Sequence, residues 1–278
     1  MPYSAEISRT HPACILVLVD QSKSMSEPFA GQPDKKKADG VADAVNRLLQ
    51  NMVLKCAKSD GVRDYFQVGV IGYGGDVTSG LTESLDDVLV PISKLADKPK
   101  RIENRLRLID DGTGGVTEQT VKFPIWFEPE AHGRTLMHGA FEAAELAVSS
   151  FILSNPESFP PIILNLTDGK PSDANPIKVA KRIMKLATTD GPALVFNLLI
   201  SEDPKPPLYF LEDESLLLDV YAKLLYRISS VLPPRFVQSA MADGFAVKEG
   251  ARGVVFNADL VAVVRFLDIG TRVTTAIR

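Results

Sequence analysis

The chain alternates between uninterrupted apolar runs and longer stretches in which apolar residues recur every three or four positions. The apolar runs are CILVLV (14–19), FQVGVIGY (66–73), PIILNL (161–166), ALVFNLLI (193–200) and GVVFNA (253–258). A run without polar alternation is typical of a strand that is covered on both faces. The pattern therefore predicts a parallel sheet that lies between two layers of helices.

Amphipathic helices are predicted between these strands. After the first strand, the apolar side chains from Val41 to Cys56 follow the spacing that forms one face of a helix. Further helices are expected over residues 136–153, 175–188, 214–231 and 259–269, the last with Asp259 as its N-cap. Strand and helix thus alternate, as in a doubly wound, mostly parallel α/β sheet with right-handed crossovers.

Two segments depart from this alternation. The segment DVTSGL (76–81) follows the second strand and a glycine-rich turn, which predicts a hairpin and an antiparallel edge strand. Residues 82–133 are too long for a simple connection, so we expect an insertion with some strand or helix of its own. Its basic side chains are interleaved with acidic ones, which favours a solvated face. We expect a single domain over residues 1–278 that carries this insertion.

Composition narrows the possible settings. The chain has 278 residues, of which 45% are apolar and 24% charged, and its net charge of -4 offers no general attraction to nucleic acid or to anionic lipid. The apolar runs are too short to span a membrane, and the first residues do not have the pattern of a secretory signal. Cys14 and Cys56 fall within a predicted strand and a predicted helix, so we expect two buried thiols and a cytoplasmic location.

Oxygen-bearing side chains gather where predicted strands end. Asp20, Ser22 and Ser24 follow the first apolar run at alternate positions, and an extended strand exit directs residues two apart to the same side. Asp168 follows the third apolar run, and Thr135 lies in the loop before the helix that precedes that run. Loops at the carboxyl ends of strands line the ligand crevice of an open α/β sheet. We therefore expect these five side chains to converge.

Two carboxylates and three hydroxyls make a set of hard oxygen donors. Such donors suit Mg²⁺, which takes six oxygen ligands at about 2.0 to 2.1 Å and usually keeps several waters. His132 and His138 lie on either side of Thr135, but no cluster of Cys or His supplies the other ligands that zinc needs. The residues therefore predict a site for Mg²⁺ or Mn²⁺.

At these residues the chain resembles the von Willebrand factor A (vWA) family, whose metal-ion-dependent adhesion site (MIDAS) carries D-x-S-x-S, a distant Thr and a distant Asp. The matching residues are Asp20, Ser22, Ser24, Thr135 and Asp168. The resemblance implies that the hydroxyls bind the metal directly, that the aspartates often act through water, and that an Asp or Glu of a partner protein completes the shell. Because neutral hydroxyls leave much of the ion's charge uncompensated, the bound ion should attract such an external anion.

The resemblance implies a non-catalytic adaptor of intracellular, bacterial type. Relatives of this type act beside AAA+ ATPases, or with protein kinases and phosphatases, in stress or signalling systems. Position 23 is lysine where the family usually has glycine, so we expect Lys23 to be the residue that sets this site apart.

Simpler interpretations exist for each hydroxyl. Ser22 and Ser24 can make local bonds from hydroxyl to backbone, and Thr135 can cap a helix that begins at Leu136. None of these explains why the two aspartates fall at the ends of two different strands. The shared metal site is therefore the favoured interpretation.

Two other functions stay open. A Mg²⁺-dependent phosphohydrolase would use Asp20 as its nucleophile, but such enzymes generally need a second carboxylate two residues on, where this chain has Ser22. In a structural subunit of a larger assembly, residues 82–133 and 235–260 would supply the contact surfaces.

Overall fold

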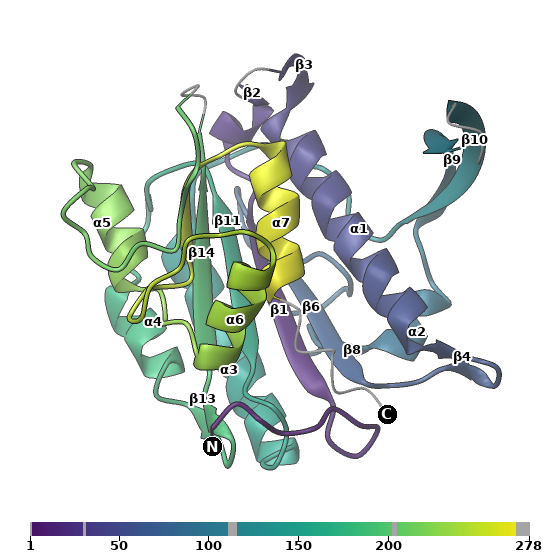
Figure 1. Cartoon of the computed structure of the whole chain (residues 1–278), viewed down its shortest axis with the longest axis horizontal. Coiled ribbons are helices and arrows are strands. Elements are labelled where there is room, and N and C mark those ends of the chain that lie inside the picture. Colours follow the sequence, from purple (N-terminus) through teal and green to yellow (C-terminus); the bar gives the residue numbers. More distant parts are fainter. Residues whose placement is uncertain (1, 30–31, 111–115, 202–204, 271–278) are drawn as a thin grey trace.

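The computed structural model describes residues 2–29, 32–110, 116–201 and 205–270, and its centre is one eight-stranded sheet (Figure 1). The sheet has the order β15-β16-β14-β11-β1-β6-β7, and β8 also pairs with β6. The five apolar runs form its five parallel strands, which are β1 (Ala13–Asp20), β6 (Phe66–Tyr73), β11 (Ile162–Thr167), β14 (Leu194–Ile200) and β16 (Val254–Ala258). The predicted doubly wound α/β fold is confirmed.

Antiparallel strands close both sides of the sheet. β7 (Val77–Ser79) pairs with β6 at one edge, as the segment 76–81 predicts. β15 (Leu208–Tyr209) pairs with β16 at the other edge, and β8 (Val90–Pro91) pairs with the beginning of β6. The sequence predicts only the first of these, because a two-residue strand carries too little alternation to be recognised.

Helices cover both faces of the sheet, as Figure 1 shows. One hydrophobic cluster joins the sheet to α1 (Lys37–Cys56), α2 (Ile92–Ala96), α6 (Pro234–Ala242) and α7 (Leu260–Gly270). A second cluster joins the opposite face to α3 (Met137–Ser154), α4 (Ile177–Ile183) and α5 (Val220–Arg227). In β1, Val17 belongs to the first cluster and Leu16 to the second, since successive side chains point to opposite faces. This two-sided burial explains the unbroken apolar runs.

Two helices are clearly shorter than predicted, and a third was not predicted. α4 ends at Ile183 because the chain then turns into a short hairpin of β12 (Ala187–Thr188) and β13 (Gly191–Pro192). α5 begins after Asp219, whose carboxylate accepts hydrogen bonds from the N–H groups of Tyr221 and Ala222. α6 was not predicted, although Pro234 occupies a first-turn position that favours helix initiation. The predicted N-cap of α7 is confirmed, since Asp259 Oδ1 accepts from Ala262 N at 2.7 Å.

The segment 82–133 folds into β8, α2 and an antiparallel hairpin of β9 (Arg101–Asp110) and β10 (Val116–Ile125). The hairpin is separate from the central sheet and projects beside α1 (Figure 1). Its base is fastened by the buried Asn46 of α1, whose Oδ1 accepts from Trp126 N at 2.8 Å and Phe127 N at 3.0 Å. Asn46 Nδ2 donates to Phe127 O at 2.7 Å. That the segment 82–133 is an insertion within a single domain stays a prediction.

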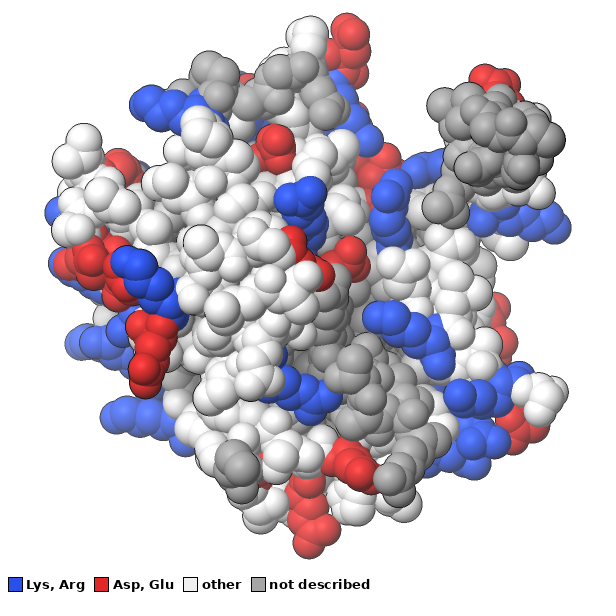
Figure 2. All heavy atoms as spheres, in the orientation of Figure 1, with Lys and Arg blue, Asp and Glu red and all other residues white. Residues whose placement is uncertain are grey.

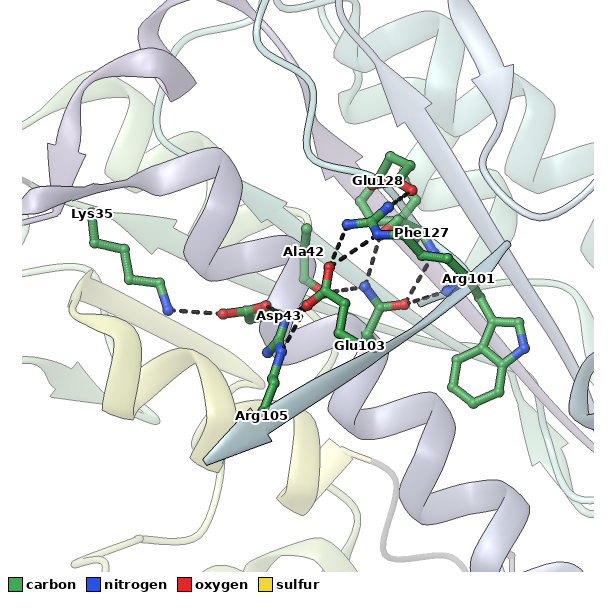
Figure 3. Close-up of polar contacts among 10 residues, drawn as sticks. Lys35, Ala42, Asp43, Arg101, Glu103, Arg105, Phe127 and Glu128 are labelled. Atoms are coloured by element: carbon green, nitrogen blue, oxygen red, sulfur yellow. Dashed lines mark hydrogen bonds and ion pairs between the residues drawn. The ribbon is translucent and has the colours of Figure 1, made fainter. Parts of the chain in front are cut away.

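The described charged side chains of this segment are exposed or half-exposed, as expected of a solvated face, and several of them also form ion pairs (Figure 3). Arg105 pairs with Glu103 of its own strand and with Asp43 of α1, and Lys35 pairs with the other oxygen of Asp43. Burial opposes ionisation of Asp43, but the hydrogen bonds from Lys35 and Arg105 hold its pKa below the usual value. Arg101 pairs with both Glu103 and Glu128. Asp111 and the side chains of Arg107 and Asp110 lie outside the described residues.

The remaining elements are short. They are the 3-10 helix η1 (Lys23–Ser26) and the two-stranded pairs β2 (Pro28–Phe29) with β3 (Gln32–Lys36) and β4 (Ala57–Lys58) with β5 (Gly61–Val62). Cys14 and Cys56 are buried free thiols. No described helix is both long and apolar enough to cross a membrane. On the face seen in Figure 2, side chains of both signs lie around a broad uncharged area.

Candidate metal centre

The candidate centre lies at the carboxyl edge of the sheet, where the strand order reverses. β1 lies between β6 and β11, and the chain leaves β1 toward β6 but leaves β11 toward β14. The loops after β1 and β11 therefore diverge, which creates the crevice where open α/β sheets bind their ligands. Asp20 is the last residue of β1, and Asp168 follows the last residue of β11.

Asp20 is buried and held by two hydrogen bonds. Its Oδ1 accepts from Ser22 N at 2.9 Å, and its Oδ2 accepts from Thr167 Oγ1 at 2.6 Å. Sequence reasoning passed over Thr167, although it directly precedes Asp168 and ends the neighbouring strand. Its hydroxyl also accepts from Gly169 N at 3.1 Å, so it orders both sides of the crevice.

The two serines connect the loop after β1 with the loop after β11. Ser22 Oγ and Ser24 Oγ lie 3.1 Å apart, and Ser24 Oγ donates to Asp168 Oδ1 at 2.7 Å. The second bond joins residues 144 positions apart in the sequence. A purely local role for the serine hydroxyls is therefore wrong for Ser24.

The loop that carries Thr135 packs against both of these loops. His132 N donates to Gln21 O at 2.7 Å, and Lys23 N donates to Gly133 O at 3.3 Å. Thr135 is buried, and a Cβ placed on Gly169 would lie 3.9 Å from Thr135 Oγ1, so this hydroxyl is next to the Asp168 loop.

Thr135 does not cap the following helix. The N-cap of α3 is Leu136, and the cap has no side-chain hydrogen bond. The backbone carbonyl of Thr135 instead accepts from Ser172 N at 2.9 Å and Ser172 Oγ at 3.1 Å. The role of the Thr135 hydroxyl as a metal ligand stays a prediction.

Electrostatics favour a cation between the two aspartates. Burial, with a smaller contribution from the nearby charge of Asp168, raises the pKa of Asp20 to about 6, although the hydrogen bonds from Ser22 and Thr167 act in the opposite direction. A carboxylate that is costly to ionise is stabilised by an adjacent positive charge. The site therefore gains from a bound cation.

The donor chemistry fits a hard divalent ion better than zinc. The five predicted side chains offer only carboxylate and hydroxyl oxygens, the ligands that Mg²⁺ and similar ions prefer. Over the described ranges, no group of three or more His, Cys, Asp or Glu is placed to hold a metal. His132 is exposed, and His138 Nδ1 lies 3.5 Å from Oε2 of Glu142 on the same helix. Any ion here would depend on the hydroxyls.

The lysine that reaches this site is Lys37, and not Lys23. Lys37 Nζ lies 3.0 Å from Asp168 Oδ2 and 3.2 Å from Glu27 Oε2, with only 4% of its side chain exposed. The side chain of Lys23 is exposed, and its backbone N–H contacts the Thr135 loop. The sequence did contain a signal for Lys37, because it lies four residues before Val41 and so extends the buried stripe of α1 by one turn.

A chain of buried polar side chains lies behind the site. Tyr73 Oη donates to Asn165 Oδ1 at 2.7 Å, Asn165 Nδ2 donates to Asn197 Oδ1 at 2.9 Å, and Asn197 Nδ2 donates to Ser229 Oγ at 2.9 Å. These bonds connect one side chain each from β6, β11 and β14 to Ser229, which follows α5. Burial, together with the charge of Asp20, raises the pKa of Tyr73 well above its usual value, so its hydroxyl stays protonated as a donor.

Comparison with known proteins gives distant structural likenesses only. No protein-family model matches the sequence, and no curated protein matches it. Among solved structures, proximal thread matrix protein 1 from the mussel byssus is 14% identical with a TM-score of 0.48, over 96% of this chain and 47% of its own. This chain thus spans about half the length of the mussel protein.

Two other solved structures are similar in part. Manganese-loaded TRAP protein of Plasmodium vivax is 12% identical with a TM-score of 0.43, over 93% of this chain and 72% of that one. The vWF domain of the type V pili tip protein Mfa5 from Porphyromonas gingivalis is 12% identical with a TM-score of 0.33, over 58% of this chain and 39% of that one. At such identities and scores, none of these likenesses indicates what this chain binds.

Proposed function

We propose that this chain is a vWA-like, non-catalytic module that binds a partner protein through a divalent cation. Asp20, Ser22, Ser24, Thr135 and Asp168 hold Mg²⁺ or Mn²⁺, and an Asp or Glu of the partner completes the shell. The observation that carries the proposal is the bond from Ser24 Oγ to Asp168 Oδ1, because it joins the two diverging loops at the switch point of the sheet.

The cation supplies positive charge at the carboxyl edge of the sheet. The hydroxyls of Ser22, Ser24 and Thr135 add no negative charge of their own, so the two aspartates alone offset the ion. The bonds from Ser22 N and Thr167 Oγ1 hold Asp20 in one orientation before any ligand arrives. Such preorganisation reduces the entropy lost on binding.

The metal site is tested by thermal unfolding with Mg²⁺ or Mn²⁺. A ligand that binds only the folded state raises the melting temperature by mass action. We expect the rise in the wild type and its loss in Ser24→Ala. Ser26→Ala is the matched control, since Ser26 lies in the same 3-10 helix, is exposed, and donates its hydroxyl locally to Lys23 O at 2.8 Å. An equal rise in wild type and Ser24→Ala would refute the site.

The partner is tested by capture from a native lysate with and without EDTA. We expect a bound protein that EDTA releases and that Ser24→Ala does not capture. If the captured proteins include an AAA+ ATPase, a kinase or a phosphatase, this would identify the kind of system in which the adaptor acts. Capture that is indifferent to EDTA would instead support the structural-subunit role, and metal-dependent hydrolysis of a phosphate ester, lost in Asp20→Asn, would contradict a non-catalytic role.

A further inference from the structure

Lys37 is placed where a lysine is costly. It is the first residue of α1, so its ammonium lies at the positive end of the helix dipole, where cations are disfavoured. Its side chain is 4% exposed, and removing an ammonium from water carries a further penalty. A lysine at such a position needs contacts that offset both penalties.

The contacts of Lys37 join the candidate metal centre to a more exposed carboxylate. One partner is Asp168 Oδ2 at 3.0 Å, whose side chain is 1% exposed. A second partner is Glu27 Oε2 at 3.2 Å, whose side chain is 53% exposed. The backbone fixes this arrangement, because Lys37 N donates to Glu27 O at 2.9 Å. The ammonium therefore lies between a carboxylate of the proposed metal set and one outside it.

The two oxygens of Asp168 are used differently. Oδ1 accepts the hydrogen bond from Ser24 Oγ within the proposed metal set, whereas Oδ2 is paired with the ammonium. A divalent ion and an ammonium repel each other strongly at short range in a buried site. Binding of the ion close to Asp168 therefore requires the ammonium to be screened or moved, and Glu27 is the carboxylate already beside it.

We propose that Lys37 is a built-in competitor of the metal, which neutralises Asp168 until a divalent cation displaces the ammonium toward Glu27. This inference rests on the proposed metal-binding function and deepens it. Lys37 is a positioning and affinity-setting residue, and Glu27 is the acceptor that makes its displacement possible. The consequence is that the charge of Asp168 is balanced without metal, and that the site binds the ion more weakly than its oxygen donors alone would.

The test measures Mn²⁺ affinity by calorimetry and by the electron paramagnetic resonance signal of the free ion. Lys37→Met keeps most of the unbranched side chain and removes the ammonium, so we expect the dissociation constant for Mn²⁺ to fall by about tenfold or more. Lys37→Arg keeps the charge and should bind no more tightly than the wild type. Lys23→Met is the control for a lysine in the same region without contact to Asp168, and we expect a change of less than about threefold.

A double-mutant cycle separates displacement toward Glu27 from simple charge removal. Glu27→Gln should weaken Mn²⁺ binding in the wild type, because the displaced ammonium then loses the carboxylate that receives it. The same substitution in the Lys37→Met background should have a much smaller effect, because no ammonium remains to be received. Equal effects of Glu27→Gln in the two backgrounds would overturn the displacement.

Failure of this inference differs from failure of the proposed function. If the wild type and Lys37→Met bind Mn²⁺ equally, and Ser24→Ala abolishes binding in both, the metal site stands and the role of Lys37 is refuted. If neither protein binds Mn²⁺ while circular dichroism shows that both are folded, the metal site itself is refuted. Lys37→Gln repeats the measurement should Lys37→Met fail to fold.

Discussion

Lys37 Nζ and Asp168 Oδ2 form an ion pair of 3.0 Å in which only 4% and 1% of the two side chains are exposed. Removing one member of such a pair leaves a buried charge uncompensated and typically costs about 3 to 5 kcal/mol, whereas replacing both is often neutral. We expect Asp168→Asn to lose about this much unfolding free energy, somewhat moderated by Glu27, and Asp168→Asn/Lys37→Met to recover most of it. Urea unfolding in EDTA measures both variants. If the double variant is as unstable as the single one, the pair is not the cause.

The pKa of Asp20 predicts how stability depends on pH in the absence of metal. Burial raises this pKa to about 6, so between about pH 4 and pH 6 the folded state binds more protons than the unfolded state. The free energy of unfolding therefore falls as pH rises through this window, by about 3 kcal/mol at most.

Asp20→Asn checks the assignment of this pH effect. The variant cannot ionise at position 20, so it should not share the loss of stability that ionisation of Asp20 causes in the wild type. The unfolding free energy of the variant minus that of the wild type should therefore increase as pH rises across the window. Urea titrations in EDTA at several pH values give this difference. Parallel profiles for the two proteins would show that Asp20 ionises normally.

Asn46 should control how firmly the β9–β10 hairpin is attached to the body of the protein. Asn46→Ala leaves the backbone groups of Trp126 and Phe127 without their side-chain partner, which costs about 2 to 4 kcal/mol for several buried hydrogen bonds. Trp126 is the only tryptophan in the sequence, so its fluorescence should shift to the red as its surroundings loosen. Asn51→Ala, on the partly exposed side of the same helix, is the control and should change stability by less than about 0.5 kcal/mol.

Tyr73→Phe should weaken the polar chain behind the site. The variant removes the donor to Asn165 Oδ1 and leaves that oxygen buried, which costs about 1 to 3 kcal/mol. Tyr221→Phe, at a half-exposed position, should cost much less. Equal losses in the two variants by chemical unfolding would mean that the buried bond contributes little.

The sequence predicted the fold well because each parallel strand is buried on both faces and leaves an unbroken apolar run. It also predicted that Ser24 and Asp168 lie at the same edge of the sheet, because the carboxyl ends of parallel strands meet there regardless of how the side chains pack. It did not predict α6 or the late start of α5, because Pro234 and Asp219 set these helix starts through local backbone geometry and side-chain capping, which leave no trace in the apolar periodicity.

Residues around the site were harder to predict for a different reason. Thr167 and Lys37 reach it through tertiary contacts, one from the next strand and one from the first turn of a helix. The loop motif D-x-S-x-S contains Lys23, so the sequence predicted that Lys23 and not Lys37 would distinguish the site. The buried lysine was visible only as a polar residue at a position of α1 where the periodicity requires an apolar one.

The central place of β1 has a consequence during synthesis on the ribosome. All eight of its residues are buried, yet one of its neighbours, β11, is not complete until Thr167 has been made. A long nascent chain therefore carries an exposed, strongly apolar segment with one pairing edge open. We expect partial chains that end before β11 to aggregate or to be held by chaperones, so the same strand that presents Asp20 also makes folding depend on the second half of the chain.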